Sequence, residues 1–67
     1  MSDLKLTLKA ARINAGLSQS EAARKIGITK DTLSNWERGK SFPDVIKLRR
    51  IECAYSVKYD DIIFLPR

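Results

Sequence analysis

Histidine is absent from this 67-residue sequence, and cysteine occurs once, at Cys53. Because structural zinc is usually held by histidine and cysteine, a single chain cannot assemble a tetrahedral zinc site. A single cysteine also excludes an intrachain disulfide and is typical of a reducing compartment. We therefore expect no metal and no cofactor, and we interpret Cys53 as a core or boundary residue rather than a redox sensor.

Long hydrophobic runs are also absent. The longest run of strong hydrophobes, "IIFL" at residues 62–65, is far too short to cross a bilayer. The N-terminal stretch "MSDLKLTLKA" intersperses charged residues and lacks the apolar centre of a signal peptide. These features predict a soluble, cytoplasmic protein with no membrane partner.

Glycine occurs three times and proline twice, and no glycine-rich phosphate-binding loop is present. The adjacent carboxylates Asp60 and Asp61 are better explained as charges in the first turn of a helix than as an acid pair. Without histidine, a phosphate loop or a convincing acid pair, the sequence argues against an enzyme.

Basic residues are in excess, with thirteen Lys and Arg against eight Asp and Glu and a net charge of +5. This charge favours a polyanionic partner such as nucleic acid, although solubility alone also calls for net charge. The length predicts one domain, residues 1–67.

Helical spacing of apolar residues and well-placed glycines predict two helices in the first part of the chain. The first is expected over residues 5–15, before Gly16. The second begins with Ser18 and Glu21, whose Ser-x-x-Glu spacing is that of a capping box, and it ends at Gly27.

The stretch "ITKDTLSNWERGK", residues 28–40, predicts a third helix with Thr29 as its N-cap and Gly39 at its end. Leu33 and Trp36 are one helical turn apart and define its inward side. The connection to the second helix is so short that the two helices must cross steeply.

A fourth helix is expected after "SFPD", with Asp44 as its N-cap and an inward face made of Val45, Leu48, Ile51 and Tyr55. Asp60 and Asp61 then suit the first turn of a brief fifth helix. No strand is predicted, because Val57 and residues 62–65 are too short and too far apart for a hairpin. The expected fold is a compact all-α bundle of five helices.

The sequence "LSQSEAARKIGITKDTLSNWERGK" resembles the helix-turn-helix of the Cro and CI repressor type, the XRE family of phage and bacterial regulators. Ala23 at the helix crossing, Gly27 in the turn, Leu33, Trp36 and the flanks "GLSQ" and "ERGK" carry this resemblance. It implies a lambda-repressor-like DNA-binding fold with the helix-turn-helix at about residues 18–38. Ser56 and Lys58 depart from the family pattern, which has glycine or asparagine and a hydroxyl cap there.

The outward face of the third helix holds the candidate base-reading residues Lys30, Asp31, Ser34 and Asn35. A major groove admits a helix and presents each base pair as a distinct pattern of donors and acceptors. Asn35 suits adenine, Lys30 suits guanine or a phosphate, and Asp31 suits either the amino group of cytosine or a capping role. The alternative for all of them is simple solvation of a surface helix.

Residues that contact phosphates are also implied by the resemblance. Gln19 stands at the start of the second helix, where backbone amides and the helix dipole favour an anion. The full expected set of phosphate-contacting residues is Arg12, Gln19, Thr29, Arg38, Lys40 and Ser41. The resemblance further implies a structural ion pair between Arg12 and Glu37.

These features predict a sequence-specific regulator, expected to be a repressor, that binds a palindromic operator in double-stranded DNA as a homodimer. The expected contact between subunits uses the apolar tail residues Ile62, Ile63, Phe64 and Leu65. The competing interpretation is an antitoxin-like or protein-interaction module that uses the same fold mainly for assembly.

Overall fold

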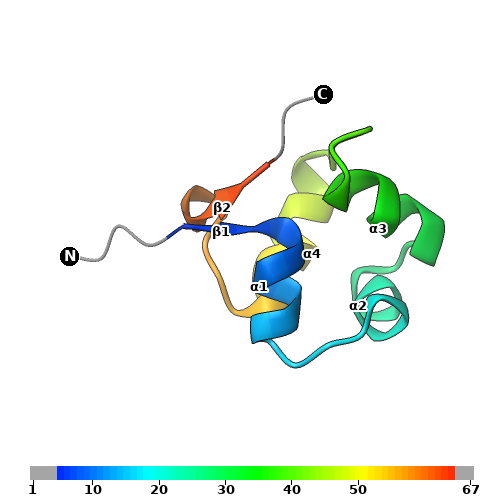
Figure 1. Ribbon diagram of the computed structural model, residues 1–67, viewed down its shortest axis with the longest axis horizontal. Helices are drawn as coiled ribbons and strands as arrows, with labels where there is room; N and C mark the ends of the chain where they lie inside the picture. Colours follow the sequence, from blue (N-terminus) through cyan, green and yellow to red (C-terminus); the bar gives the residue numbers. More distant parts are fainter. Residues whose placement is uncertain (1–4, 65–67) are drawn as a thin grey trace.

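The computed structural model describes residues 5–64, within which the chain forms four α-helices, a 3-10 turn and two very short strands. Their order is β1 (Leu6–Thr7), α1 (Leu8–Asn14), α2 (Gln19–Ile26), α3 (Lys30–Glu37), α4 (Val45–Tyr55), η1 (Tyr59–Asp61) and β2 (Ile62–Ile63). The strands lie at the end of the molecule opposite α2 and α3 (Figure 1). The fold is predominantly helical, as predicted.

Helix α1 begins three residues later than predicted. The side-chain oxygen of Thr7 accepts a hydrogen bond from the backbone N–H of Ala10 at 3.1 Å, and the extended backbone of Thr7 makes it the N-cap. Leu6 and Thr7 are extended because they pair with the other end of the domain. Leu6 and Thr7, which the prediction placed in the helix, form β1 instead.

The predicted fifth helix is wrong. Residues Tyr59–Asp61 form only the single 3-10 turn η1, and Lys58 before it makes no side-chain capping bond. The carboxylate of Glu52 instead accepts a hydrogen bond from the backbone N–H of Tyr59 at 2.7 Å. The turn is therefore held from α4, and the chain extends immediately after it.

The prediction of no strand is also wrong. Ile62 and Ile63 pair in parallel with Leu6 and Thr7, respectively. A hairpin joins two strands that are neighbours in sequence, whereas a parallel pair joins segments separated by a long crossover. Here nearly the whole domain forms that crossover, so no local pattern marks the pairing.

Helix α4 is capped by Asp44, whose carboxylate accepts from the N–H of Lys47 at 2.9 Å. Its predicted inward face is correct at Ile51 and Tyr55, which are buried, but wrong at Val45, which is 66% exposed in the first turn. Ser56 ends the helix with a left-handed backbone, φ 55°. Serine thus takes the conformation for which the family pattern supplies glycine or asparagine.

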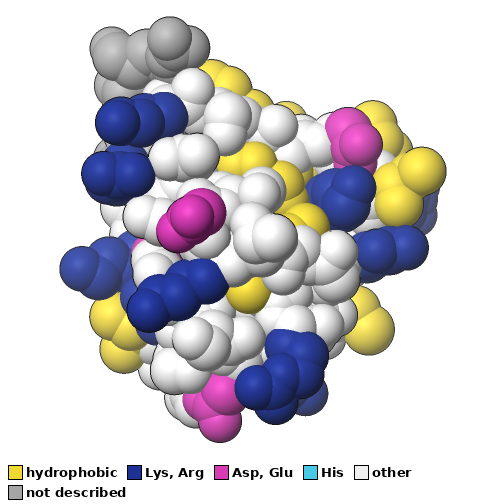
Figure 2. All heavy atoms as spheres, turned by 90° about the vertical axis from the view of Figure 1, so that its right-hand side faces the viewer, with side chains coloured by type: hydrophobic (Ala, Val, Ile, Leu, Met, Phe, Trp, Pro, Cys, Tyr) yellow, Lys and Arg dark blue, Asp and Glu magenta, His cyan; other side chains and the backbone are white. Residues whose placement is uncertain are grey.

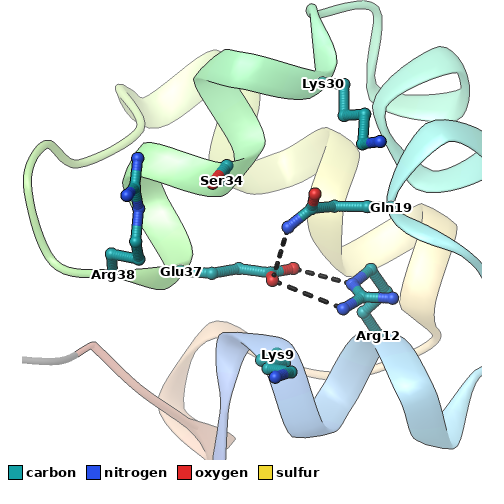
Figure 3. A pocket seen from close by; sticks show the side chains of 7 residues that line it. All are labelled: Lys9, Arg12, Gln19, Lys30, Ser34, Glu37 and Arg38. Carbon is teal, nitrogen blue, oxygen red and sulfur yellow. Dashed lines mark hydrogen bonds and ion pairs between the residues drawn. The ribbon is translucent and has the colours of Figure 1, made fainter.

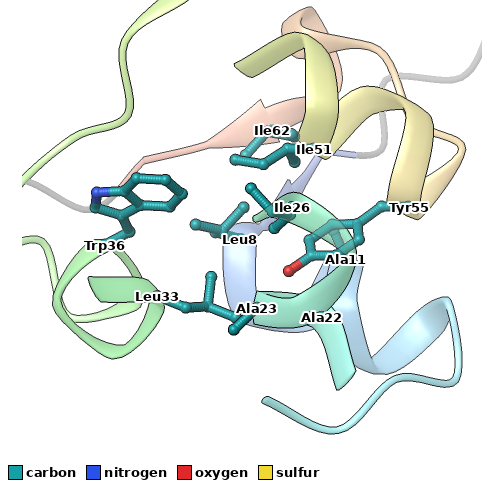
Figure 4. Close-up of a cluster of buried hydrophobic side chains, with 10 residues drawn as sticks. All are labelled: Leu8, Ala11, Ala22, Ala23, Ile26, Leu33, Trp36, Ile51, Tyr55 and Ile62. Carbon is teal, nitrogen blue, oxygen red and sulfur yellow. The ribbon is translucent and has the colours of Figure 1, made fainter. Parts of the chain in front are cut away.

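One buried cluster joins all four helices and β2 (Figure 4). It contains Leu8, Ala11, Ala22, Ala23, Ile26, Leu33, Trp36, Ile51, Tyr55 and Ile62. The small residues Ala22 and Ala23 allow α2 to approach its neighbours closely, as the steep crossing requires. Trp36, at 5% exposed, packs in this core.

Candidate nucleic-acid interface

Capping interactions fix where α2 begins and ends and where α3 begins. Ser18 and Glu21 form the complete capping box: the Glu21 N–H donates to the Ser18 hydroxyl oxygen at 3.1 Å, and the Ser18 N–H donates to the Glu21 carboxylate at 2.8 Å. The bond from the Ser18 N–H contributes most to lowering the pKa of Glu21, and the Ser18 side chain adds to this shift. Gly27 ends α2 at φ 86°, and Thr29 caps α3 through the N–H of Thr32 at 3.1 Å.

Helix α4 also contacts the turn between α2 and α3. The Nη1 atom of Arg50 donates a hydrogen bond to the carbonyl oxygen of Ile26 at 3.2 Å. A Cβ atom on Gly27 would lie 2.9 Å from the same Nη1 atom. The left-handed backbone favours glycine at this position, and an added Cβ would also displace the flexible end of Arg50 from its bond to Ile26.

Helix α3 divides into the two faces that its sequence predicts. Leu33 and Trp36 are buried, and Glu37 is 8% exposed. On the other side, Lys30, Asp31 and Arg38 are exposed, whereas Ser34 and Asn35 are half-buried. The core therefore leaves the four candidate base-reading residues accessible.

Arg12, Gln19 and Glu37 form one hydrogen-bonded network beneath this surface (Figure 3). Nε of Arg12 lies 2.7 Å from Oε2 of Glu37, and Nη2 lies 3.4 Å from Oε1. Nε2 of Gln19 donates to the same Oε1 at 3.0 Å, and Nη1 of Arg12 donates to the carbonyl of Leu17 at 2.9 Å. The ion pair implied by the resemblance is present between α1 and α3, and the Gln19 hydrogen bond connects α2 to it.

This network limits what Arg12 can contact. Arg12 is only 8% exposed, and three of its N–H donors already bind Glu37 and Leu17. Gln19 is half-buried, with its amide directed to Glu37. Of the expected phosphate contacts, Arg12 is thus the one whose geometry best fits a supporting role.

A hollow of about 650 Å³ opens over the network between α1, α2 and α3 (Figure 3). Its lining residues are Lys9, Arg12, Gln19, Lys30, Ser34, Glu37 and Arg38. Lys9, Lys30 and Arg38 are exposed, so the walls of the hollow carry accessible positive charge. Such a surface attracts a polyanion.

Lys9 was missed by the sequence analysis. It lies three residues before Arg12 on α1, and residues at this spacing share one face of a helix. The signal was therefore available once Arg12 had been placed near the interface. Lys9 has the exposed position that Arg12 lacks.

The remaining expected phosphate contacts lie at the ends of α3. Thr29 is exposed, although its hydroxyl is already engaged with Thr32 in the cap. Lys40 and Ser41 are exposed after Gly39, which has a φ of 77°. Seen from the side of α2 and α3, Lys and Arg side chains lie around much of the margin, with uncharged groups, some hydrophobic side chains and scattered acidic groups between them (Figure 2).

Tyr55 is the other unusual titratable group. Burial, and then the negative charge of Glu37, raise its pKa to about 12, while the charge of Arg12 opposes this shift. Its hydroxyl is buried and has no hydrogen-bond partner within residues 5–64. We assign Tyr55 to the core, where its ring packs.

Within residues 5–64, no three acidic, cysteine or histidine side chains are grouped so as to hold a metal ion. Nor is any described helix both long and apolar enough to span a bilayer. Cys53, interpreted from the sequence as a core or boundary residue, is exposed and therefore not part of the core.

Comparison with known families agrees with this geometry. The helix-turn-helix family model matches residues 8–62, which covers α1 to α4, η1 and the first residue of β2. The chain belongs to this family. The Cro/CI-type resemblance seen in the sequence is thereby confirmed.

Curated relatives are named as transcriptional regulators. The chain is 41% identical over 56 residues to the HTH-type transcriptional regulator ImmR of Bacillus subtilis, covering 84% of this chain and 44% of ImmR. It is 29% identical over 56 residues to the HTH-type transcriptional activator BcrR of Enterococcus faecalis, covering 84% of this chain and 28% of BcrR. An uncharacterized HTH-type regulator of B. subtilis, YgzD, is 29% identical over 62 residues, covering 92% of this chain and 94% of YgzD.

The chain thus spans less than half the length of ImmR and BcrR but nearly the whole of YgzD. Membership of the family identifies a helix-turn-helix domain of the transcriptional-regulator type and not an enzyme.

Proposed function

We propose that this protein is a sequence-specific regulator that inserts α3 into the major groove of double-stranded DNA. The observation that carries the proposal is the accessible outer face of α3 beside the positively charged hollow. The regulator acts by occupying an operator, so repression by blocking other proteins is the expected outcome. Such action on DNA takes place in the cytoplasm.

Base reading is assigned to Lys30, Asp31, Ser34 and Asn35. Asn35 can accept from N6 and donate to N7 of adenine, and Lys30 can donate to guanine. Ser34 can bind either a base edge or a phosphate. Asp31, in the first turn of α3, either accepts from cytosine N4 or stabilises the positive end of the helix.

Phosphate binding is assigned to residues around the hollow and at the helix ends. These are Lys9, Gln19, Thr29, Arg38, Lys40 and Ser41. Contacts of this kind fix the protein on the duplex without reading sequence. Arg12 is assigned to holding Glu37 and Gln19 in place, so its contribution to phosphate binding is indirect.

Homodimerisation on a palindromic operator is also proposed, with a revised contact surface. Ile62 is 7% exposed and belongs to the core, so it is not available to a second subunit; Leu65 lies outside the described residues. Ile63 and Phe64 remain, and Phe64 packs edge-on to Phe42 at 6.3 Å between ring centroids. Sedimentation of the protein with and without operator tests this contact, and a monomer in both samples would rule it out.

An assembly module of the antitoxin type is the second candidate. The exposed apolar side chains Phe42, Val45, Ile46, Tyr59 and Ile63 favour it, because exposed apolar groups suit protein contacts. Copurification of a toxin partner would support this alternative.

Selection from random duplex DNA at several salt concentrations tests the proposed function. We expect a palindromic consensus and an affinity that falls steeply with salt, since each neutralised phosphate contributes a slope of about −0.9. Recovery of all sequences equally would contradict a sequence-specific regulator.

A further inference from the structure

The side chains of Asn35 and Arg38 are joined on the exposed side of α3. Nη2 of Arg38 donates a hydrogen bond to Oδ1 of Asn35 at 3.1 Å. A guanidinium group has donors and no acceptor, so the amide oxygen of Asn35, and not its nitrogen, must face Arg38. The bond therefore determines which way the Asn35 amide is turned.

The backbone holds Arg38 in position to make this bond. Arg38 ends α3, and its N–H donates to the carbonyl of Ser34 at 3.0 Å. Gly39 follows with φ 77° and is buried, and the N–H of Lys40 returns to the carbonyl of Asn35 at 2.9 Å. These backbone hydrogen bonds return the chain after α3 to the last turn of the helix. They fix the backbone of Arg38 about one helical turn after Asn35.

We propose that Asn35 and Arg38 read DNA as a coupled pair, in which Arg38 is a positioning residue that sets the base preference of Asn35. The proposal rests on the proposed function, because it assumes that α3 enters the major groove. It assigns to Arg38 a role in specificity beyond the phosphate contact expected from the sequence.

The chemistry of the amide explains the coupling. Adenine presents an acceptor, N7, beside a donor, the N6 amino group, and an asparagine amide matches both when its oxygen and nitrogen are in the right order. The Asn35 oxygen has a second lone pair for N6, and its NH2 group stays free for N7. Without Arg38, the amide can adopt either orientation, and the one with oxygen and nitrogen exchanged does not match adenine.

The remaining N–H groups of Arg38 are available to the DNA. Arg38 also lines the hollow with Lys30 and Ser34, so its guanidinium lies on the side where the proposed base-reading residues are. A neighbouring guanine or a phosphate can accept from it. Arg38 can therefore orient Asn35 and contact DNA at the same time.

The test is the base preference of Arg38→Ala, measured at every position of the site that wild-type protein selects from random duplex DNA. Asn35→Ala identifies the base pair that Asn35 reads. Lys40→Ala is the matched control, because Lys40 is also an exposed cation at the end of α3. Thermal unfolding checks that each variant is folded.

We expect Arg38→Ala to reduce the preference at the Asn35 base pair by about two- to tenfold, the contribution of one net hydrogen bond. In an Asn35→Ala background, Arg38→Ala should no longer change the preference at that base pair. Lys40→Ala should lower overall affinity and keep every preference.

If Arg38→Ala keeps the wild-type preference and weakens all sequences equally, as Lys40→Ala does, the coupled pair is refuted and Arg38 is a phosphate contact alone. A wild-type protein without any base preference would overturn both this inference and the proposed function. The base preferences of the wild-type protein therefore distinguish failure of the coupled pair from failure of the proposed function.

Discussion

Nε of Arg12 on α1 lies 2.7 Å from Oε2 of Glu37 on α3, and the two side chains are 10% and 4% exposed, respectively. Gln19 joins the same carboxylate from α2. Three helices that carry the proposed DNA-binding surface are thus linked through one side chain. Removing the charge of Glu37 leaves the Arg12 cation buried without its partner. The loss of one partner destabilises a protein more than the replacement of both partners by apolar residues.

Glu37→Gln should therefore destabilise the protein by about 2–3 kcal/mol, since the amide can still accept one hydrogen bond but no longer neutralises Arg12. For a domain of this size each kcal/mol lowers the melting temperature by roughly 4–8 °C. Thermal and urea unfolding measure the loss. Base preference should be retained, because the Glu37 carboxylate is buried against Arg12 and Gln19 and is not one of the proposed base-reading groups.

The double variant Arg12→Met/Glu37→Met is the control for this prediction. Apolar replacement of both partners of a buried ion pair is often neutral or stabilising, so the double variant should be more stable than Glu37→Gln. A Glu37→Gln protein with native melting and altered base preference would show that Glu37 faces the DNA instead.

Tyr55→Phe should leave the unfolding free energy at neutral pH unchanged or raise it by up to about 1 kcal/mol. The variant removes a buried hydroxyl that has no partner within the described residues and keeps the ring in the core. Tyr59→Phe, at an exposed position, is the matched control and should have little effect. A loss of stability specific to Tyr55→Phe would mean that the hydroxyl makes a stabilising contact.

At alkaline pH, the unfolding free energies of Tyr55→Phe and Tyr59→Phe should differ. Tyr55 has a pKa of about 12 when folded, against about 10 when unfolded. The unfolded chain therefore releases this proton first, and the unfolding free energy falls as the pH rises from about 10 to about 12. Urea unfolding across this range should show a smaller decline in Tyr55→Phe than in Tyr59→Phe, and equal declines would contradict the shifted pKa.

Gly27→Ala should destabilise the protein more than Gly16→Ala. Both glycines have positive φ, so both substitutions carry backbone strain of about 1–2 kcal/mol. At Gly16 an added Cβ meets nothing within 4 Å, whereas at Gly27 it meets Nη1 of Arg50 at 2.9 Å. The extra loss at Gly27 is the bond from Arg50 to Ile26, about 1 kcal/mol.

An Arg50→Ala background isolates this close approach. There the two glycine substitutions should cost the same in urea unfolding, because the atom that Cβ would meet is gone. A difference that persists without Arg50 would place its cause elsewhere in the turn.

The helix-turn-helix was predictable because its signals are local. Ser18 with Glu21, Gly27 and Thr29 mark helix ends by their own backbone and capping chemistry, and these ends are where the structure has them. The two faces of α3 likewise follow from helical spacing around Leu33 and Trp36. Such features need no knowledge of the rest of the chain.

The errors concern contacts between distant segments. Pairing of Leu6 with Ile62 turned a predicted helix start into a strand and placed a predicted interface residue in the core. Helical spacing could have placed Lys9 beside Arg12, but the hollow that Lys9 lines exists only because α1 packs against α3. The Arg38 to Asn35 bond depends on side-chain rotamers at a helix end, which helical spacing does not specify.

The most direct test of base reading by α3 compares wild-type protein with Asn35→Ala on the selected operator and on a scrambled duplex, at salt concentrations between about 50 and 200 mM. Asn35→Ala should reduce the ratio of the two affinities by about five- to a hundredfold while the salt dependence stays the same. If Asn35→Ala instead binds both duplexes as wild-type protein does, the outer face of α3 does not read the bases.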